Sequence, residues 1–262
     1  MTHIFDDPLS GDLGGVTRLA GDVPVSPDRL GLVRPTAHGP ESPGMIRLPD
    51  GPPPSFDGAF QARLETLIAW RRDVRRFSER PVPPTLIEHL LDLAQLSPSV
   101  GNSQPWRWVR VESAVKRAAI RANFLTSNAA ARDSLPNERA RKYASLKLAG
   151  LERAPVQFAV LCDRATEQGL GLGRNTMPEM LEYSVAGMVS TFSLAARAAG
   201  LGVGWVSILD PREVGRLLET PPAWKLIAYL CVGWPDEEHL DPELERHGWQ
   251  SRTGAGRRVR TV

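Results

Sequence analysis

The segment from Pro178 to Ala199 constrains the fold most, because its residues 184–196 are apolar or small all the way round a helix. A helix of that kind is buried on most of its sides, and Gly200 is a suitable residue to end it. Two apolar runs of strand length, 156–162 and 226–234, lie before and after it in the chain. Such continuous runs indicate buried strands. We therefore expect this helix to lie in the core beside a sheet, or at an interface between subunits.

Further helices and strands are indicated on both sides of this centre. Apolar spacing predicts helices over 56–71, from Pro84 to before Pro98, over 112–150 with a break at 134–137, and over 211–218. Strands are predicted at 106–111 and 202–208. The mixture predicts an α+β or α/β sandwich, with helices on both faces of a central sheet of four to five strands. Of the two classes we expect α+β, with a mixed sheet. Gly202 and Gly204 predict that another segment comes close to the backbone of the 202–208 strand.

The chain divides by composition into two parts. Residues 1–56 are rich in proline and glycine and show little periodicity, which predicts a mostly irregular extension. We expect residues 57–262 to form one domain. From about residue 235 the chain becomes polar and irregular, which predicts a C-terminal arm that packs on another surface, such as a second subunit.

Charge and composition exclude several classes of protein. The net charge of +2 gives no sign of a nucleic-acid or membrane partner. No apolar run of about 18 residues and no secretory signal is visible, so we expect a cytoplasmic protein. Cys162 and Cys231 lie in apolar runs and are expected to be reduced thiols. The histidines are scattered and paired cysteine motifs are absent from the sequence, so no metal site is expected.

The run Arg71-Arg72-Asp73-Val74-Arg75-Arg76 places four guanidiniums at the end of the first predicted helix. The simpler interpretation is a solvated basic helix end, which the helix dipole favours. The alternative is a phosphate clamp, because arginine binds phosphate through two parallel hydrogen bonds. A carboxylate repels phosphate, so a clamp that keeps Asp73 uses it for chemistry or to orient an arginine.

Three other groups of polar residues allow two interpretations each. Ser99, Asn102 and Gln104 lie in a turn that could also bind a flat heteroaromatic ligand. Tyr143 and Lys147 stand four residues apart, on one face of a predicted helix, which is either a solvated face or a lid over a pocket. Trp205 and Ser207 share one face of a predicted strand, where Ser207 is either an ordinary strand residue or a hydroxyl that faces a ligand.

Several motifs together resemble the nitroreductase-like flavoprotein superfamily. They are Arg71-Arg72-x-x-Arg75, Pro98-Ser99-x-Gly101-Asn102-x-Gln104-Pro105-Trp106 and Gly202-x-Gly204-x-x-Ser207. Within the superfamily, the 5,6-dimethylbenzimidazole synthases look most similar, over roughly residues 60–252. The residues that carry this closer match are Asp73, the 142–148 run, Cys162-Asp163-Arg164 and 202–208. General nitroreductases usually have serine where this chain has Asp73.

The resemblance implies FMN bound at the interface of a homodimer with swapped C-terminal arms. It implies catalytic roles for Asp73 and Ser207, with no metal. It also implies that Arg252, from the arm, is a further phosphate ligand. The residues implied to bind FMN are Arg71, Arg72, Asp73, Val74, Arg75, Ser99, Asn102, Gln104, Trp205 and Arg252.

The implied reaction is the oxygen-dependent fragmentation of reduced FMN to 5,6-dimethylbenzimidazole, the lower ligand of cobalamin, and a four-carbon sugar phosphate. Reduced FMN would be a substrate, supplied by a separate NAD(P)H-flavin reductase. Two alternatives are an NAD(P)H-dependent FMN nitroreductase and a non-enzymatic flavin carrier. Asp73 and the Tyr143–Lys147 lid argue against the nitroreductase, because nicotinamide needs an open pocket. Binding alone would not need Asp73 beside a phosphate clamp.

Overall fold

The fold is that of a computed structural model, which describes residues 51–262 of the 262-residue chain. The predicted extension, residues 1–56, therefore lies outside the described residues except for 51–56. Within the described part, no helix has both the length and the apolar character needed to cross a membrane.

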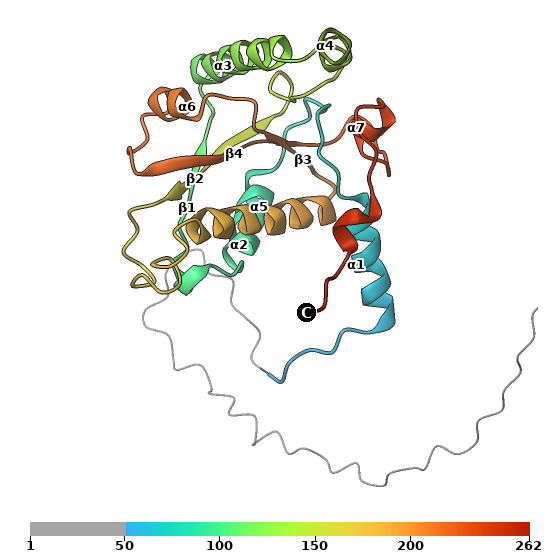
Figure 1. The fold of residues 1–262 in the computed structure, drawn as a ribbon. Coiled ribbons are helices and arrows are strands. Elements are labelled where there is room, and N and C mark those ends of the chain that lie inside the picture. The colour runs from blue at the N-terminus through green and yellow to red at the C-terminus, as the bar shows by residue number, and fades with distance from the viewer. Residues whose placement is uncertain (1–50) are drawn as a thin grey trace, which may run out of the picture. The chain divides into compact units, whose positions relative to one another are not determined.

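Four strands form one sheet in the order β1-β2-β4-β3 (Figure 1). Their bounds are β1 Trp106–Arg110, β2 Val156–Asp163, β3 Gly202–Val206 and β4 Trp224–Gly233. Each neighbouring pair is antiparallel. The parallel part of the expected mixed sheet is a single isolated bridge between Asp73 and Val203. The predicted α+β class is confirmed, with the smaller of the two expected strand numbers.

Helices cover both faces of this sheet, as predicted (Figure 1). One face carries α2 (Pro84–Gln95) and α5 (Met180–Ala198), and the other carries α3 (Ala114–Asp133) and α6 (Pro211–Leu217). The remaining elements are α1 (Gly58–Trp70), α4 (Asn137–Ala144), α7 (Glu243–Arg246) and the short 3-10 helices η2 (Val100–Asn102) and η3 (Gly254–Arg257). Pro84 begins α2 at its first position, where its missing N–H costs no hydrogen bond.

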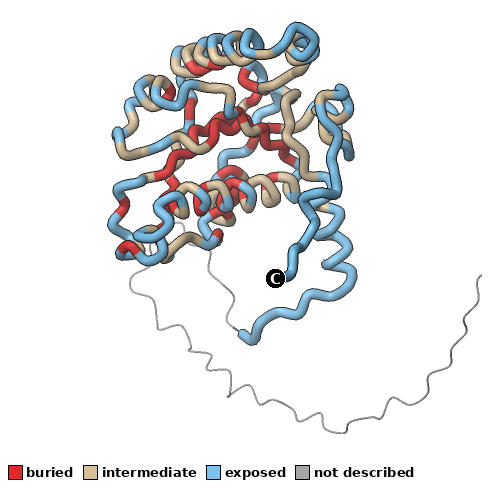
Figure 2. The backbone as a smooth tube through the Cα atoms, viewed as in Figure 1, coloured by how far each residue is buried: buried red, intermediate tan, exposed pale blue. Residues whose placement is uncertain are grey.

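The core lies on both sides of the sheet, where buried backbone runs through its centre (Figure 2). In β2, Phe158 and Val160 pack toward α2 and α5, whereas Ala159 and Leu161 pack toward α3 and α6. Because both faces of β2 are covered, its sequence is apolar without alternation. Burying a side chain such as that of Leu161 contributes about 1.5–3 kcal/mol, so these layers fix the order of the strands.

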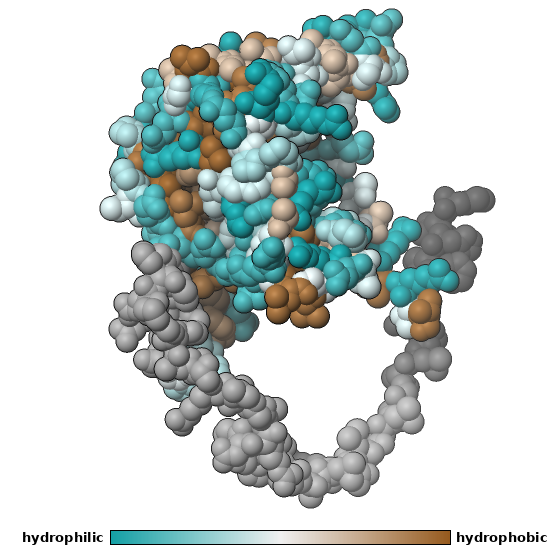
Figure 3. All heavy atoms as spheres, turned by 90° about the vertical axis from the view of Figure 1, so that its left-hand side faces the viewer, coloured by the Kyte–Doolittle hydropathy of each residue, from teal (hydrophilic) through white to brown (hydrophobic). Residues whose placement is uncertain are grey.

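Two helices keep apolar surface uncovered within the described chain. Val185 and Met188 of α5 are fully buried, but Tyr183 on the same helix is 57% exposed. In α1 no residue is buried, and Leu64 and Ile68 are 41% and 53% exposed. The face shown in Figure 3 lies on the opposite side of the domain from α1 and is mostly hydrophilic, with apolar side chains in separate groups. The apolar surface of α1 is therefore a place where a second chain could pack.

Candidate functional site

The candidate site begins where residues 71–76 leave α1 and run beside β3. The N–H of Val74 donates to the carbonyl of Val203 at 3.0 Å. A Cβ atom on Gly204 would lie 2.1 Å from the Val74 carbonyl oxygen, and one on Gly202 would lie 2.6 Å from the Val74 side chain. Only glycine lets the two backbones approach so closely. The close approach predicted for this strand is confirmed, and it fixes the arginine run to the edge of the sheet.

Asp73 is held at this edge by two donors. Its Oδ1 accepts the main-chain N–H of Trp205 at 2.7 Å, and its Oδ2 accepts the Nε–H of Arg75 at 3.0 Å. Burial raises the pKa of the Asp73 carboxyl, while the N–H of Trp205 and the charge of Arg75 act in the opposite direction. The side chain is still 38% exposed. It is therefore a carboxyl that a ligand can reach and that takes up a proton more readily than an ordinary aspartate.

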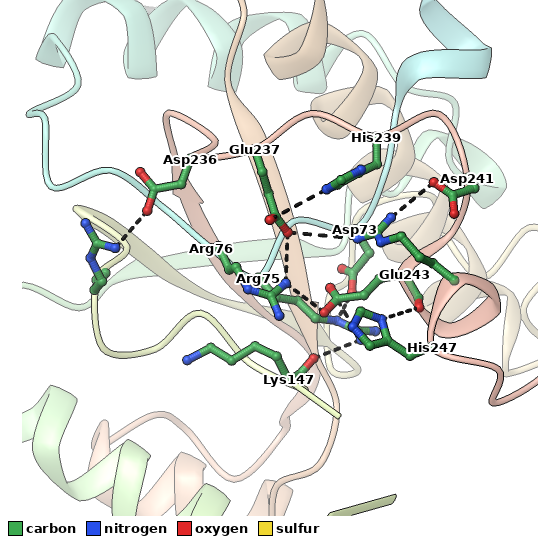
Figure 4. Close-up of polar contacts among 12 residues, drawn as sticks. Asp73, Arg75, Arg76, Lys147, Asp236, Glu237, His239, Asp241, Glu243 and His247 are labelled. Atoms are coloured by element: carbon green, nitrogen blue, oxygen red, sulfur yellow. Dashed lines mark hydrogen bonds and ion pairs between the residues drawn. The ribbon is translucent and has the colours of Figure 1, made fainter. Parts of the chain in front are cut away.

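The guanidinium of Arg75 is bound by other groups of the protein (Figure 4). Its side chain is 11% exposed. Besides the bond to Asp73, its Nη1 donates to the main-chain carbonyl of Lys147 at 2.9 Å and lies 3.9 Å from Oε2 of Glu243. These contacts fix the guanidinium beside Asp73, which is the orienting arrangement that the sequence allowed for.

Arg76 is also paired with carboxylates of the C-terminal arm. Its Nη1 donates to Glu237 at 2.9 Å and to Glu243 at 2.8 Å. The hydrogen bond to Glu243 is the largest of the effects that raise the pKa of the Arg76 guanidinium. The sequence analysis missed both glutamates, because the arm has no periodicity that indicates which of its residues face inward.

Within residues 51–262, the positive charges of Arg71, Arg72 and Arg252 form a group without an ion pair to a carboxylate, although the nearby charge of Asp241 partly offsets that of Arg72. Burial, together with the charges of Arg252 and Arg71, lowers the pKa of the Arg72 guanidinium. The Nε–H of Arg72 donates to a main-chain carbonyl, that of Leu240, at 2.7 Å. Within residues 51–262, none of the hydrogen bonds or ion pairs uses the Arg71 side chain. The Arg71 side chain is thus available to bind a phosphate. Arg72 already donates from Nε, Nη1 and Nη2 to main-chain carbonyls, which leaves one N–H on each Nη for a further acceptor.

Arg71 and Arg72, but not Arg252, line a groove that is open to solvent. Its walls are residues 70–76 and 201–203, Ser193 and Arg197 of α5, and the arm between Glu237 and Arg246. Among the described residues, no three side chains of His, Cys, Asp or Glu gather as a metal site would require.

The second predicted group, Ser99, Asn102 and Gln104, lies in the loop before β1. The hydroxyl of Ser99 accepts the N–H of Gln104 at 3.0 Å. Asn102 and Gln104 have φ angles of 54° and 41°, which are rare for residues other than glycine and collect at functional sites. The Ser103 hydroxyl is buried without a hydrogen-bond partner among the described residues. This loop is thus strained and has an unused polar group.

The structure does not bring this loop to the arginine run within one chain. The loop leads into β1 and the arginine run lies beside β3, and these two strands are at opposite edges of the sheet. Three strand spacings of about 4.8 Å separate them, or roughly 14 Å. That the loop and the arginine run bind the same ligand therefore stays a prediction.

Trp205 and Ser207 are the predicted site residues of the 202–208 strand. Trp205 supplies the N–H that holds Asp73, and Ser207 follows two residues later. Ser207 lies just past the end of β3, is exposed, and accepts the N–H of Leu209 through its carbonyl at 3.0 Å. Its hydroxyl is therefore available just past the end of the strand whose Trp205 binds Asp73.

The prediction that Tyr143 and Lys147 share one helical face is wrong. Helix α4 ends at Ala144, because the chain turns there and the N–H of Ser145 bonds back to Lys142. The Tyr143 hydroxyl donates to Asn128 of α3 at 2.8 Å. Lys147 instead contributes its carbonyl to Arg75. The segment still lies near the site, but through the main chain and not through a shared helical face.

The C-terminal arm packs on its own chain as far as Trp249. Besides the pairs with Arg76, Glu238 bonds to Arg197 at 2.7 Å, and the rings of Trp249 and Tyr143 lie 6.0 Å apart. Residues 250–262 are exposed. The predicted exchange of arms between subunits therefore remains a prediction, and it concerns these last residues, which include Arg252.

Comparison with known proteins gives consistent matches. Residues 68–234 match the model of the Nitroreductase family. A 5,6-dimethylbenzimidazole synthase of Rhodospirillum rubrum is 56% identical over 199 residues, which is 76% of this chain and 94% of that protein. One of Rhodobacter capsulatus is 44% identical, over 75% of this chain and 95% of that protein. A crystal structure of oxidized iodotyrosine deiodinase bound to FMN and 3-iodo-L-tyrosine has a TM-score of 0.58 and 27% identity, over 67% of this chain and 91% of that one.

Proposed function

The chain belongs to the nitroreductase family, and from this premise we propose that it uses oxygen to fragment reduced FMN. The products are 5,6-dimethylbenzimidazole, for the lower ligand of cobalamin, and a four-carbon sugar phosphate. The names of the relatives at 56% and 44% identity support this product. The observation that carries the proposal is the reachable carboxyl of Asp73, held by Trp205 and Arg75 beside Arg71 and Arg72, which form no ion pair within residues 51–262.

The residues of the groove fit FMN. Arg71, Arg72 and Arg252 would bind its phosphate, because none of them forms an ion pair with a carboxylate within residues 51–262. Val74 and Trp205 would border the flavin from the edge of the sheet, since both lie where the arginine run meets β3. The FMN named in the iodotyrosine deiodinase structure supports the same ligand in this fold.

We infer that the working form is a homodimer. Ser99, Asn102 and Gln104 would reach the flavin from a second copy, because their own loop lies at the opposite edge of the sheet. The exposed apolar residues of α1, such as Leu64 and Ile68, would be covered in the same assembly. Each site would then combine the arginine run of one chain with the loop of the other.

The protein groups would act on protons and water. Reduced FMN, when bound, supplies the electrons for the reaction with oxygen. Asp73 would take a proton from the ribityl chain, since its raised pKa suits a general base. Arg75 would orient Asp73, and the hydroxyl of Ser207 would donate a hydrogen bond to the ring. The segment around Tyr143 and Lys147, whose Lys147 carbonyl binds Arg75, would keep water from the site. A separate NAD(P)H-flavin reductase would supply reduced FMN.

The test is to mix the full chain with chemically reduced FMN, admit oxygen, and follow products by mass spectrometry. We expect 5,6-dimethylbenzimidazole to appear as FMN is lost. A parallel sample with NADPH and a nitroaromatic compound tests the nitroreductase alternative. Intact oxidised FMN together with hydrogen peroxide would overturn the proposal, and bound FMN without turnover in either sample would indicate a flavin carrier.

A further inference from the structure

Glu243 is a buried carboxylate that the proposed reaction has not yet used. It is the first residue of the short helix α7, after Pro242. Its side chain is only 9% exposed and points into the groove toward Arg75 and Arg76 (Figure 4). A carboxylate with so little access to water must be paired with positive groups, because an unpaired buried charge is costly. Glu243 and the two arginines therefore hold one another in position.

Glu243 and Asp73 share one guanidinium. Asp73 accepts the Nε–H of Arg75 at 3.0 Å, while Oε2 of Glu243 lies 3.9 Å from Nη1 of the same side chain. The other oxygen of Glu243 accepts from Arg76 at 2.8 Å. Arg75 thus lies between two carboxylates, and its charge is divided between them. The hold of Arg75 on Asp73 is weaker than it would be in an isolated pair.

From this geometry we propose that Glu243 is a positioning residue. By sharing the positive charge of Arg75, it weakens the pairing of Arg75 with Asp73 and so keeps the Asp73 carboxyl available to accept a proton. The inference deepens the proposed function and rests on it for the role of Asp73 as a base. The negative charge of Glu243 also contributes, after burial, to the raised pKa of Asp73.

Groups on several elements face Asp73 or the arginines that hold it. Arg75 and Arg76 belong to the same segment, Trp205 of β3 contributes its N–H, and the buried thiol of Cys231 lies in β4. Burial raises the pKa of that thiol to about 12, so it stays neutral at ordinary pH. The groups from other segments are Glu237 and Glu243 of the arm, which pair with Arg76, and Lys147, whose ammonium is paired with Glu152. Glu237 in turn pairs with His239 and Arg246. Arg72 belongs to the same segment as Asp73 and has the charge of Arg252 beside it.

Glu237 provides a matched control for Glu243. It accepts from the same atom, Nη1 of Arg76, at 2.9 Å. It is 41% exposed, and its ion pairs are with Arg76, His239 and Arg246 and do not include Arg75. Glu243→Gln and Glu237→Gln therefore each remove one negative charge from the arm, but only Glu243→Gln removes a carboxylate that pairs with Arg75.

The experiment is a pH titration of the Asp73 carboxyl by carbon NMR in the full chain, with Asp73→Asn to assign the signal. We expect Glu243→Gln to move the titration of Asp73 to lower pH and Glu237→Gln to leave it in place. In the turnover assay with reduced FMN, the acid limb of the pH profile should move in the same direction in Glu243→Gln, with a several-fold lower rate at the plateau. Glu243→Asp keeps the carboxylate charge but holds it farther from Arg75, because the side chain is shorter. The titration of Asp73 in this variant should therefore lie between its titrations in wild type and in Glu243→Gln.

The titration of Asp73 tests the role of Glu243 separately from the proposed fragmentation of FMN. An unchanged titration of Asp73 in Glu243→Gln, or an equal change in Glu237→Gln, would overturn the role of Glu243 whatever the activity is. If Glu243→Gln does not fold, Glu243→Asp decides in the same way, because an unmoved titration there would also overturn it. A shifted titration in a protein that forms no 5,6-dimethylbenzimidazole would support the sharing of Arg75 and reject the proposed reaction.

Discussion

The carboxylate of Asp73 accepts the main-chain N–H of Trp205 at 2.7 Å. This bond ties the segment after α1 to β3, two parts of the chain that lie 132 residues apart. Asp73 also accepts the Nε–H of Arg75, so its carboxylate is bound by one neutral donor and one charged donor. The geometry makes Asp73 both a structural link and the candidate base, so the two roles must be separated by experiment.

Substitution of Asp73 by asparagine should separate binding from chemistry. The amide oxygen can still accept the N–H of Trp205, but the amide cannot act as a base. We expect FMN binding to persist and product formation to fall by about 10²–10⁴-fold, the usual contribution of a general base. Fluorescence quenching gives the first quantity and product analysis the second. Glu79→Gln, at a side chain that is 77% exposed, is the control. Unchanged turnover in Asp73→Asn would limit Asp73 to orienting Arg75.

The pH dependence of turnover should reflect the raised pKa of Asp73. A base must be ionised, so the rate should fall as the pH drops through that pKa. Because burial raises it, the acid limb should lie above pH 3.8, the ordinary value of an aspartate. Since the folded protein binds this proton more tightly than the unfolded chain, Asp73 favours folding less as the pH rises through the same range. The limb should disappear in Asp73→Asn, and its persistence there would assign it to another group.

Removal of Arg71 should weaken phosphate binding and little else. A charge-assisted hydrogen bond contributes about 1.5–3 kcal/mol, so the Kd for FMN should rise by about 10- to 100-fold in Arg71→Ala. Riboflavin lacks the phosphate, and its Kd should not change. The melting temperature should also be unaltered, because the described residues form no side-chain bond to Arg71. Arg110→Ala, on the edge strand β1, is the control. Equal losses for FMN and riboflavin would contradict the phosphate role.

A methyl group at Gly204 should displace the arginine run. Its Cβ would lie 2.1 Å from the Val74 carbonyl oxygen, so the backbone of one segment must move. We expect Gly204→Ala to lower the free energy of unfolding by about 1–3 kcal/mol and to abolish FMN binding. Urea denaturation and flavin titration measure the two effects. A Cβ at Gly58 meets nothing within 4 Å, so Gly58→Ala should behave like wild type. Normal flavin binding by Gly204→Ala would show that the segment tolerates the shift.

A charge on the exposed face of α1 should dissociate the proposed dimer. Ile68 is 53% exposed in the single chain, and an aspartate there would be buried unpaired at an interface. By sedimentation equilibrium, wild type should have twice the chain mass of 28.7 kDa, and Ile68→Asp should have the mass of one chain and lose FMN. Val115→Asp introduces the same charge at a residue that is 78% exposed on α3 and should remain dimeric. A monomeric wild type that binds FMN would reject the two-chain site.

Much of the local structure followed from the sequence, because each signal acts over a few residues. The apolar run 156–162 predicted β2, which is buried on both faces. Pro84 predicted the start of α2, since proline suits the first turn of a helix. Gly202 and Gly204 predicted that another segment would come close to this strand, although not which one. The motif of Asp73 and its arginines also indicated the family.

The tertiary structure decided which distant groups meet. Glu243 binds Arg76 across 167 residues, and the carbonyl of Lys147 binds Arg75 across 72. Sequence periodicity shows which side of an element is apolar, but it contains no information on the order of strands in a sheet. That order places Ser99 and Asp73 at opposite edges. The end of α4 at Ala144, which separates Tyr143 from Lys147, was likewise set by packing and turn hydrogen bonds. The sequence by itself thus determined the elements and the chemical groups, whereas only the packing of the sheet determined which groups share a site.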